Sequence, residues 1–386
     1  MINPAIAWSE MRRRYKLIIC ALILGAAAVR AEDCARLQEF DEIAQTVTER
    51  FYDRTFRGLD WSSTVARYRS SVACDFKERE LAAVLNSLLA ELKASHTAVY
   101  TQDQLDYWAL QSIFAFDLEK YQVPFAGIWP VQVAGEWVAK YVLDHSPAAE
   151  AGVSPGDKLI RLDGRPFEPL GFKTDADSIL VFSPAPGVER AVRIRAINQS
   201  VSAALLEATR KSERVIRVGT RSVGYVHLWS GTHPLFLESL DAALDRFAAR
   251  GVDAILLDLR GGFGGASLEY IEQLQSDPRL ERVRKYALID DGVRSGKEWV
   301  AGTLKNERSA TLVGSRTAGA FLAASPFGFA DDKYLLYLAV SSFDAPGIGP
   351  IEGIGVEPDV PVAPCRSYCA GRDPQLEAAL KLIDES

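Results

Sequence analysis

The stretch VDAILLDLRGGFGG, from Val252 to Gly265, joins a run of apolar residues to a cluster of glycines. A short apolar run that ends at turn residues is typical of a strand buried on both faces, as in a parallel sheet. Glycines after such a strand leave backbone N–H groups free to face an oxyanion or a phosphate. A phosphate loop would need Gly-Lys-Ser/Thr where Ala266-Ser267 stands, and a purely structural glycine turn is the alternative.

Strand-like and helix-like segments alternate on both sides of this stretch. Before it come SVGYVHLW and the amphipathic FLESLDAALDRFAARG, and after it come ASLEYIEQLQS, YALID, GKEWVAGTLKN, ATLVG and apolar strands around YLLYLAVSS. The chain closes with PQLEAALKLIDE, where Pro374 suits the first turn of a helix. Alternating strands and helices predict an α/β layered core, which we assign to residues 206–386.

The part of the chain before this core changes pattern twice. Residues 36–95 have apolar residues at three- and four-residue spacing, which predicts helices, and we assign a helical N-terminal segment to residues 32–118. From about residue 116 short strands follow, and SPAAEAGVSPGDKLIRLDGRPF contains a short helix, a tight turn and a strand. We assign residues 119–205 to a separate β-rich domain. The fold class predicted for the whole chain is therefore multi-domain α/β.

The N-terminus has the order of a secretory signal peptide. MRRRYK, from Met11 to Lys16, is followed by the apolar LIICALILGAAAV and by Val29-Arg30-Ala31. A basic region, a short apolar region and a small-residue cleavage site predict a signal peptide over residues 1–31. We therefore expect a periplasmic or secreted protein with no stable membrane anchor after cleavage. A buried N-terminal helix is the alternative.

The charge balance excludes one class of partner. Acidic residues (51) outnumber Lys plus Arg (44), which gives a net charge of -7, and no basic run occurs beyond the N-terminus. Nucleic acid is therefore not an expected partner.

Four cysteines remain after the predicted cleavage: Cys34, Cys74, Cys365 and Cys369. An even number in an oxidising compartment favours disulfides, and the economical pairing is local, Cys34 with Cys74 and Cys365 with Cys369. A zinc site is the weaker alternative because no histidine lies near them.

The stretch DDGVRSGKEW, Asp290 to Trp299, places Ser295 and Gly296 at a strand-to-helix turn. The partial positive charge of a helix N-terminus favours a developing anion, so Ser295 is a candidate nucleophile. Helix capping by a serine is the alternative.

Two more stretches carry candidate side chains. LKASHTAVY places Ser95 and His96 just after a predicted helix, and the glycine-rich IGPIEGIGVEPDVPV contains Glu352. No two of the four histidines have metal-ligand spacing, so we expect neither a metal nor another cofactor. A structural histidine and a solvated surface carboxylate are the alternatives for these residues.

Taken together, these stretches resemble the C-terminal-processing (tail-specific) serine peptidases, a group that also contains the tricorn core proteases. DLRGGFGG stands where that family has Asp-Leu-Arg-x-Asn-x-Gly-Gly, with Gly262 in place of Asn, and GVRSGKEWVAGTL stands at its serine-rich run, with Ser295 at the nucleophile position. VGSRTAG and GVEPDV match the next two blocks, and DHSPAAEAGVSPGDKLIRLDG resembles a bacterial PDZ domain. The resemblance implies a PDZ-like domain followed by a ClpP/crotonase-like peptidase core.

One departure from the family concerns the base. In the C-terminal-processing branch a lysine deprotonates the serine, but Ala320 stands at that position here. The tricorn-like branch uses a Ser-His pair and a Glu instead, and this chain has both. The resemblance therefore assigns His96 as general base for Ser295, with Ser95 and Glu352 to relay and orient it. The N–H of Gly296, with that of Gly264 or Gly265, would form the oxyanion hole.

Lys297 is a second candidate base, two residues from Ser295. Residues two apart on a helix do not face each other, so we expect Lys297 to point away and to be exposed or in contact with substrate.

The resemblance also implies how peptide would be bound. A PDZ groove adds an extended peptide to a sheet edge, and its carboxylate-binding loop would fall near Phe125, Gly127 and Ile128.

The function that follows is an exported serine endopeptidase that cleaves peptides or unfolded protein tails through an acyl-enzyme. A non-catalytic peptide-binding protein on a decayed peptidase core is the alternative, because the lysine is missing and the serine run is thinned. An esterase-like hydrolase is a third possibility. The oligomeric state is not predicted.

Overall fold

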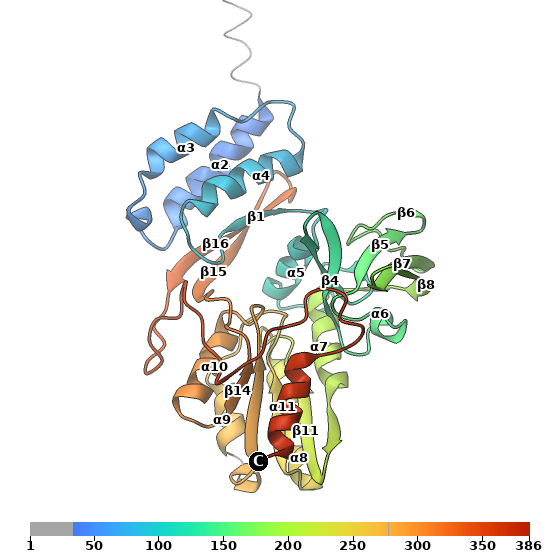
Figure 1. The fold of residues 1–386 in the computed structure, drawn as a ribbon. Coiled ribbons are helices and arrows are strands. Elements are labelled where there is room, and N and C mark those ends of the chain that lie inside the picture. The colour runs from blue at the N-terminus through green and yellow to red at the C-terminus, as the bar shows by residue number, and fades with distance from the viewer. Residues whose placement is uncertain (1–33, 277) are drawn as a thin grey trace, which may run out of the picture.

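The computed structural model describes residues 34–276 and 278–386. Within them the chain forms a helical N-terminal part, a β-rich part and an α/β core, which Figure 1 shows from the N-terminus in blue to the C-terminus in red. The predicted signal peptide, residues 1–31, lies outside the described residues.

The N-terminal part is built from helices that pack on one another. They are α2 (Ala35–Arg50), the 3-10 turn η1 (Phe56–Gly58), α3 (Trp61–Arg69) and α4 (Glu78–Ala90). Helix α3 begins where the Asp60 carboxylate accepts a hydrogen bond from the Ser63 N–H at 3.1 Å, a typical N-cap. The apolar faces of α2 and α4 form one core, in which Phe40, Leu81 and Leu85 are fully buried.

A three-stranded sheet lies beneath these helices (Figure 1) and closes their core. Its order is β1-β16-β15, with β1 at Ala98–Thr101, β15 at Leu322–Phe329 and β16 at Tyr334–Ser342. Strands β1 and β16 are antiparallel, and Ala98 pairs with Tyr337. The sequence prediction placed YLLYLAVSS among the core strands, but β16 leaves the parallel sheet. It binds the N-terminal part because the buried Leu336 and Leu338 pack on the helices.

Helix α5 (Leu105–Phe114) leads into the β-rich part. Its main sheet has the order β3-β4-β5-β7-β8, β6 pairs with β5, and β2 pairs with β9. The elements are β2 (Val123–Phe125), β3 (Ile128–Val133), β4 (Glu136–Val142), α6 (Pro147–Glu150), β5 (Lys158–Leu162), β6 (Arg165–Pro166), β7 (Asp177–Ala185), β8 (Val188–Arg195) and β9 (Ile197–Gln199). This part has a hydrophobic core of its own, which includes Leu159, Leu180 and Phe182.

The α/β core is a six-stranded sheet in the order β10-β11-β12-β13-β14-β17. Strand β10 is antiparallel to β11, and the remaining neighbours are parallel. The strands are β10 (Arg214–Val218), β11 (Arg221–His227), β12 (Ala254–Asp258), β13 (Arg284–Ile289), β14 (Thr311–Gly314) and β17 (Val360–Pro361). The helices are α7 (Val201–Ser212), α8 (Pro234–Arg250), α9 (Glu269–Ser276), η2 (Pro278–Leu280), α10 (Gly296–Asn306) and α11 (Pro374–Asp384).

Strand β12 shows why the sheet has helices on both faces. All five of its residues are buried. Ile255 and Leu257 belong to the core that contains α7, α8 and α10, whereas Ala254 and Leu256 pack with α11 on the opposite face. This alternation is the expected result of a period of two along a strand. It confirms the α/β fold class predicted from VDAILLDLRGGFGG.

The two predicted disulfides are confirmed. Cys34 is bonded to Cys74, and Cys365 to Cys369. Along residues 34–276 and 278–386, no helix combines the length and the apolar character that crossing a membrane requires.

Candidate active site

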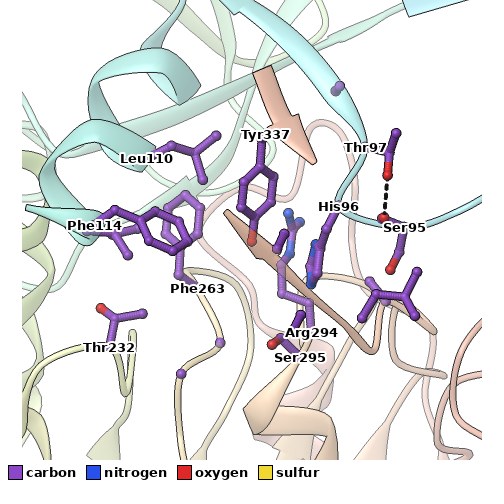
Figure 2. Close-up of a pocket in the computed structure, with 18 of the residues that line it drawn as sticks. Ser95, His96, Thr97, Leu110, Phe114, Thr232, Phe263, Arg294, Ser295 and Tyr337 are labelled. Carbon is purple, nitrogen blue, oxygen red and sulfur yellow. Dashed lines mark hydrogen bonds between the residues drawn. The ribbon is translucent and has the colours of Figure 1, made fainter. Parts of the chain in front are cut away.

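A cavity of 680 Å³ lies where the N-terminal part, the α/β core and the sheet β1-β16-β15 meet. Its lining includes Ser95, His96, Gly264, Gly265 and Ser295, five of the residues that the sequence assigned to catalysis. Figure 2 shows Ser95 and His96 on one wall, with Ser295 and Arg294 next to them. The cavity therefore brings Ser95 and His96 together with Gly264 and Ser295, which lie some 170 and 200 residues later in the chain.

Ser295 stands at the turn between β13 and α10, where it is the residue before the first helical position. Its φ of 54° lies in the left-handed region, which is uncommon for a residue with a side chain and marks local strain. The Ser295 N–H donates to the Ala320 carbonyl at 2.8 Å. Ser295 and Glu298 form a capping box, so this serine also serves as the N-cap of α10, as the helix-capping alternative expected.

Glu298 holds this turn in place, and the sequence prediction missed it. Its carboxylate accepts hydrogen bonds from the Thr317 hydroxyl at 2.6 Å and from the N–H groups of Gly319, Ala320 and Ser295 at 2.7, 2.8 and 3.2 Å. Burial raises the pKa of Glu298, and these donors oppose that rise. The signal was present in the sequence, because Ser295 and Glu298 have the spacing of a capping box.

The glycine cluster lies directly against Ser295. A Cβ added to Gly264 would come within 2.5 Å of the Ser295 Cβ, so no larger residue fits there without displacement of the turn. The N–H groups of Gly264, Gly265 and Gly296 donate no hydrogen bond to any group of the described residues. Free N–H groups beside a hydroxyl are what an oxyanion hole requires.

His96 is held with its ring in the cavity and its backbone in the left-handed region, at a φ of 53°. Its Nε2 is buried and has no hydrogen-bond partner within the described chain, and no hydrogen bond to Ser295 Oγ is formed in this structure. Burial lowers the pKa of His96 to about 4, helped by the charge of Arg294 and opposed by Glu352 and by the Ala320 carbonyl. His96 is therefore neutral at pH 7 and has the protonation state of a base.

Ser95 and Glu352 are in direct contact, 257 residues apart in the chain. The Glu352 carboxylate accepts from the Ser95 N–H at 2.9 Å and from the Ser95 hydroxyl at 2.8 Å. It also accepts from the Phe321 N–H at 2.7 Å. Glu352 thus joins the loop that carries His96 to the loop after Ala320, whose carbonyl binds the Ser295 N–H. The solvated-carboxylate alternative does not describe Glu352.

Lys297 corrects the sequence prediction in part. It is fully buried, not exposed, and it does not line the cavity. Its Nζ donates to the Gly261 carbonyl at 2.6 Å, the Leu228 carbonyl at 3.2 Å and the Trp229 carbonyl at 3.4 Å. The reason is local: two residues along the helix from Ser295, the side chain turns under the glycine cluster instead of outward. Burial lowers the pKa of Lys297 to about 7.

The predicted peptide-binding residues lie at the start of the β-rich part. Phe125 ends β2 and Ile128 begins β3, and both side chains are buried. Gly127 has a φ of 84°, and a Cβ there would come within 2.2 Å of the Ser146 Cβ. Strand β3 is at the edge of its sheet, and Val131 and Val133 on it are 37% and 46% exposed.

Comparison with known proteins adds family matches to this geometry. Residues 273–362 match peptidase family S41, and residues 34–90 match the tricorn protease C1 domain. The first segment contains Ser295, Glu298 and Glu352, and the second contains the helices that precede His96.

Two curated relatives and two solved structures show the same likeness. The chain is 25% identical to a carboxyl-terminal-processing protease of Synechocystis over 96% of this chain and 93% of that protein. It is 23% identical to a putative tricorn protease homolog 2 of Streptomyces coelicolor over 90% of this chain, but it spans only 32% of that longer protein.

Among solved structures, the photosystem II D1 C-terminal processing protease matches with a TM-score of 0.55 at 17% identity, and the match covers 91% of this chain and 97% of that protein's chain. The tricorn protease has a TM-score of 0.52 at 19% identity and covers 91% of this chain and 36% of its own. The two family matches around Ser295 and before His96, on a fold shared with these structures, show that the chain is similar to serine peptidases of family S41.

Proposed function

We propose that this chain is an exported serine endopeptidase that hydrolyses peptide bonds in peptides or protein C-terminal tails. One observation carries the proposal. The Ser295 hydroxyl, the unused N–H groups of Gly264 and Gly265, and the buried, unpartnered Nε2 of His96 line a single cavity. Each of these groups has a role in acyl transfer.

The reaction would begin at Ser295. His96 Nε2 takes the hydroxyl proton as Oγ attacks the scissile carbonyl carbon, and a C–O bond forms. The negative charge that develops on the carbonyl oxygen is stabilised by the N–H of Gly296 and that of Gly264 or Gly265. His96 then gives its proton to the leaving amine as the C–N bond breaks. Water, deprotonated by the same imidazole, hydrolyses the acyl-enzyme and releases the serine.

Ser95 and Glu352 would support the base. The Glu352 carboxylate favours the imidazolium that forms during the reaction, because its charge raises the pKa of His96. Two of its hydrogen bonds hold Ser95 in the loop that carries His96, and the third joins it to the Phe321 N–H. Glu352 and Ser95 therefore orient the base and stabilise its charged form.

The β-rich part would act as a PDZ-like domain. Strand β3 has an unpaired edge, and an extended peptide could add to it by main-chain hydrogen bonds. In this arrangement Phe125, Gly127 and Ile128 belong to the loop that faces the peptide terminus. Two disulfides in the described chain favour an oxidising compartment, which supports export to the periplasm or the medium.

Replacement of Ser295 by alanine tests the catalytic part of the proposal. We expect Ser295→Ala to abolish hydrolysis of an internally quenched peptide while the circular dichroism spectrum and melting temperature stay unchanged. The matched control is Ser267→Ala, because Ser267 lies in the glycine-rich region but outside the cavity lining. Hydrolysis that persists in Ser295→Ala would refute the mechanism. Peptide binding by the wild type without any turnover would favour the non-catalytic alternative.

A further inference from the structure

Arg294, the residue before the proposed nucleophile, has its side chain in the active-site cavity (Figure 2). Its Nε is buried and has no hydrogen-bond partner, and no carboxylate of the described chain forms an ion pair with it. Arginine carries a permanent positive charge, and a desolvated charge without a partner is costly. Arg260, which follows β12, differs in this respect, because it forms ion pairs with Asp258 and Asp373.

The rest of the cavity wall is mostly apolar. Helix α5 contributes Leu110, Ile113 and Phe114, which lie on the same face of the helix, and the glycine cluster contributes Phe263. Tyr337 projects from β16 toward Arg294 (Figure 2). Apolar walls exclude water and so strengthen any interaction with the guanidinium.

Asp106 is the one acidic residue in the cavity lining, and it does not neutralise Arg294 by contact. Burial raises the pKa of Asp106, and the charge of Arg294 opposes that rise. The other side chains that titrate here are neutral at pH 7: His96 has a pKa of about 4, and burial raises those of Tyr100 and Tyr337. The cavity thus contains a permanent cation with which no carboxylate of the described chain is in contact.

We propose that Arg294 recognises a carboxylate of the peptide next to the scissile bond. The planar guanidinium matches a carboxylate with two parallel hydrogen bonds, which is the strongest pairing available to it. Because Arg294 directly precedes Ser295, a carboxylate bound there lies beside the bond under attack. The group has two possible sources, an acidic side chain or the terminal carboxylate of the chain. This inference rests on the proposed function, since it names the substrate class of the same site.

A binding experiment tests the inference without hydrolysis. Calorimetry on the Ser295→Ala protein would compare peptides that differ by one group: Glu against Gln at the residue beside the scissile bond, and a free terminal acid against its amide. We expect one pair to show tighter binding of the acid by about tenfold to a hundredfold, as a charge-assisted pair provides. A difference in the first pair identifies a side chain as the source, and a difference in the second identifies the chain terminus.

Two further variants make the test specific. In the double variant Ser295→Ala, Arg294→Gln the preference for the acid should disappear while the neutral peptide binds as before. The matched control adds Asp106→Asn to Ser295→Ala, which removes the other charge of the cavity and should leave the preference intact or increase it.

Equal binding of acid and amide in both pairs would overturn the inference, as would a preference that survives Arg294→Gln or a stronger binding of a lysine-containing peptide. A failure of Ser295-dependent hydrolysis, by contrast, would contradict the proposed function and leave this binding result to stand by itself.

Discussion

The proposed base, His96, is a histidine whose neutral form is strongly favoured. Its Nε2 is buried and Arg294 lies nearby, and both effects lower the pKa of His96 to about 4. A base with a low pKa stays unprotonated in acid, although it also takes up the serine proton less readily. The carboxylate of Glu352 partly offsets this by favouring the imidazolium.

This arrangement predicts an acidic limit to activity. Because a protonated His96 cannot accept the Ser295 proton, kcat/KM should fall as the pH drops through about 4, not through the value near 6.5 of an ordinary histidine. In Arg294→Gln the like charge is gone, so the limit should move to higher pH. A pH profile of kcat/KM on a neutral peptide measures both. A limit near 6.5 in the wild type, or no upward movement in the variant, would contradict the assignment.

The lowered pKa of Lys297 predicts a second pH dependence, that of the free energy of unfolding. Its pKa is about 7 in the folded chain, below the ordinary value of 10.5, so between these values the unfolded chain binds one more proton than the folded chain. The free energy of unfolding should therefore rise with pH from 7 to 10, by up to roughly 4 kcal/mol from this group. Urea unfolding at several pH values would show a smaller rise in Lys297→Met. Identical slopes in both proteins would mean that the folded amine keeps its ordinary pKa.

At the scale of elements, strand β1 positions His96, which lies two residues before the strand begins at Ala98. It pairs with β16 on one side, and on its outer edge the Asn86 side chain takes the place of a neighbouring strand. The Val99 N–H donates to Asn86 Oδ1 at 2.7 Å, and Asn86 Nδ2 donates to the Val99 carbonyl at 2.8 Å. An edge strand of four residues depends on such contacts to keep its register.

Asn86→Ala should therefore make β1 and the adjacent loop with His96 more mobile, although Asn86 does not contact His96. The two lost hydrogen bonds should lower the free energy of unfolding by about 1–3 kcal/mol. They should also reduce kcat, because the loop that carries His96 becomes less ordered. Hydrogen exchange at Val99 would report the loosening directly. Ser87→Ala, the next residue on the same helix and exposed, is the matched control. A variant with normal kcat and unchanged exchange would show that β1 holds its position without Asn86.

The elements also show what the sequence could and could not predict. The buried strand β12 and its helices follow from local period and composition, because these patterns act within a few residues. The pairing of β1 with β16 joins residues that are 239 positions apart at Ala98 and Tyr337, and no local pattern signals it. The contact of Ser95 with Glu352 was expected only from family resemblance. Helical spacing predicts that Lys297 points away from Ser295, but it does not predict the burial of Lys297, which depends on the carbonyl groups around the glycine cluster.

At the scale of the whole molecule, all three parts of the chain contribute contacts around the candidate active site. The Asp290 carboxylate accepts from the Tyr141 hydroxyl of the β-rich part at 2.8 Å and from the N–H groups of Gly292 and Gly261 at 2.9 and 3.3 Å. The β-rich part is thus tied to the turn before Ser295 and to the glycine cluster. The helical part reaches the same place through β1.

The disulfide Cys34–Cys74 should matter most for the helical part. It spans 40 residues, whereas Cys365–Cys369 spans 4. Loop-closure entropy gives a stabilisation of about 4 kcal/mol for the longer loop and about 2 kcal/mol for the shorter one. Melting of Cys34→Ser/Cys74→Ser and of Cys365→Ser/Cys369→Ser would compare the two. The first variant should melt at the lower temperature, and the reverse order would show that the closed loop around α2 and α3 does not limit stability.

The most direct test of the central claim is to map covalent labelling by a fluorophosphonate probe. Mass spectrometry of the labelled wild type should place the adduct on Ser295 alone. The rate of labelling should fall by about a hundredfold or more in His96→Ala, because general-base catalysis contributes this much, and folded Lys297→Met should still be labelled. An adduct on another residue would contradict the account. So would labelling of Ser295 that is unaffected by His96→Ala but lost in folded Lys297→Met.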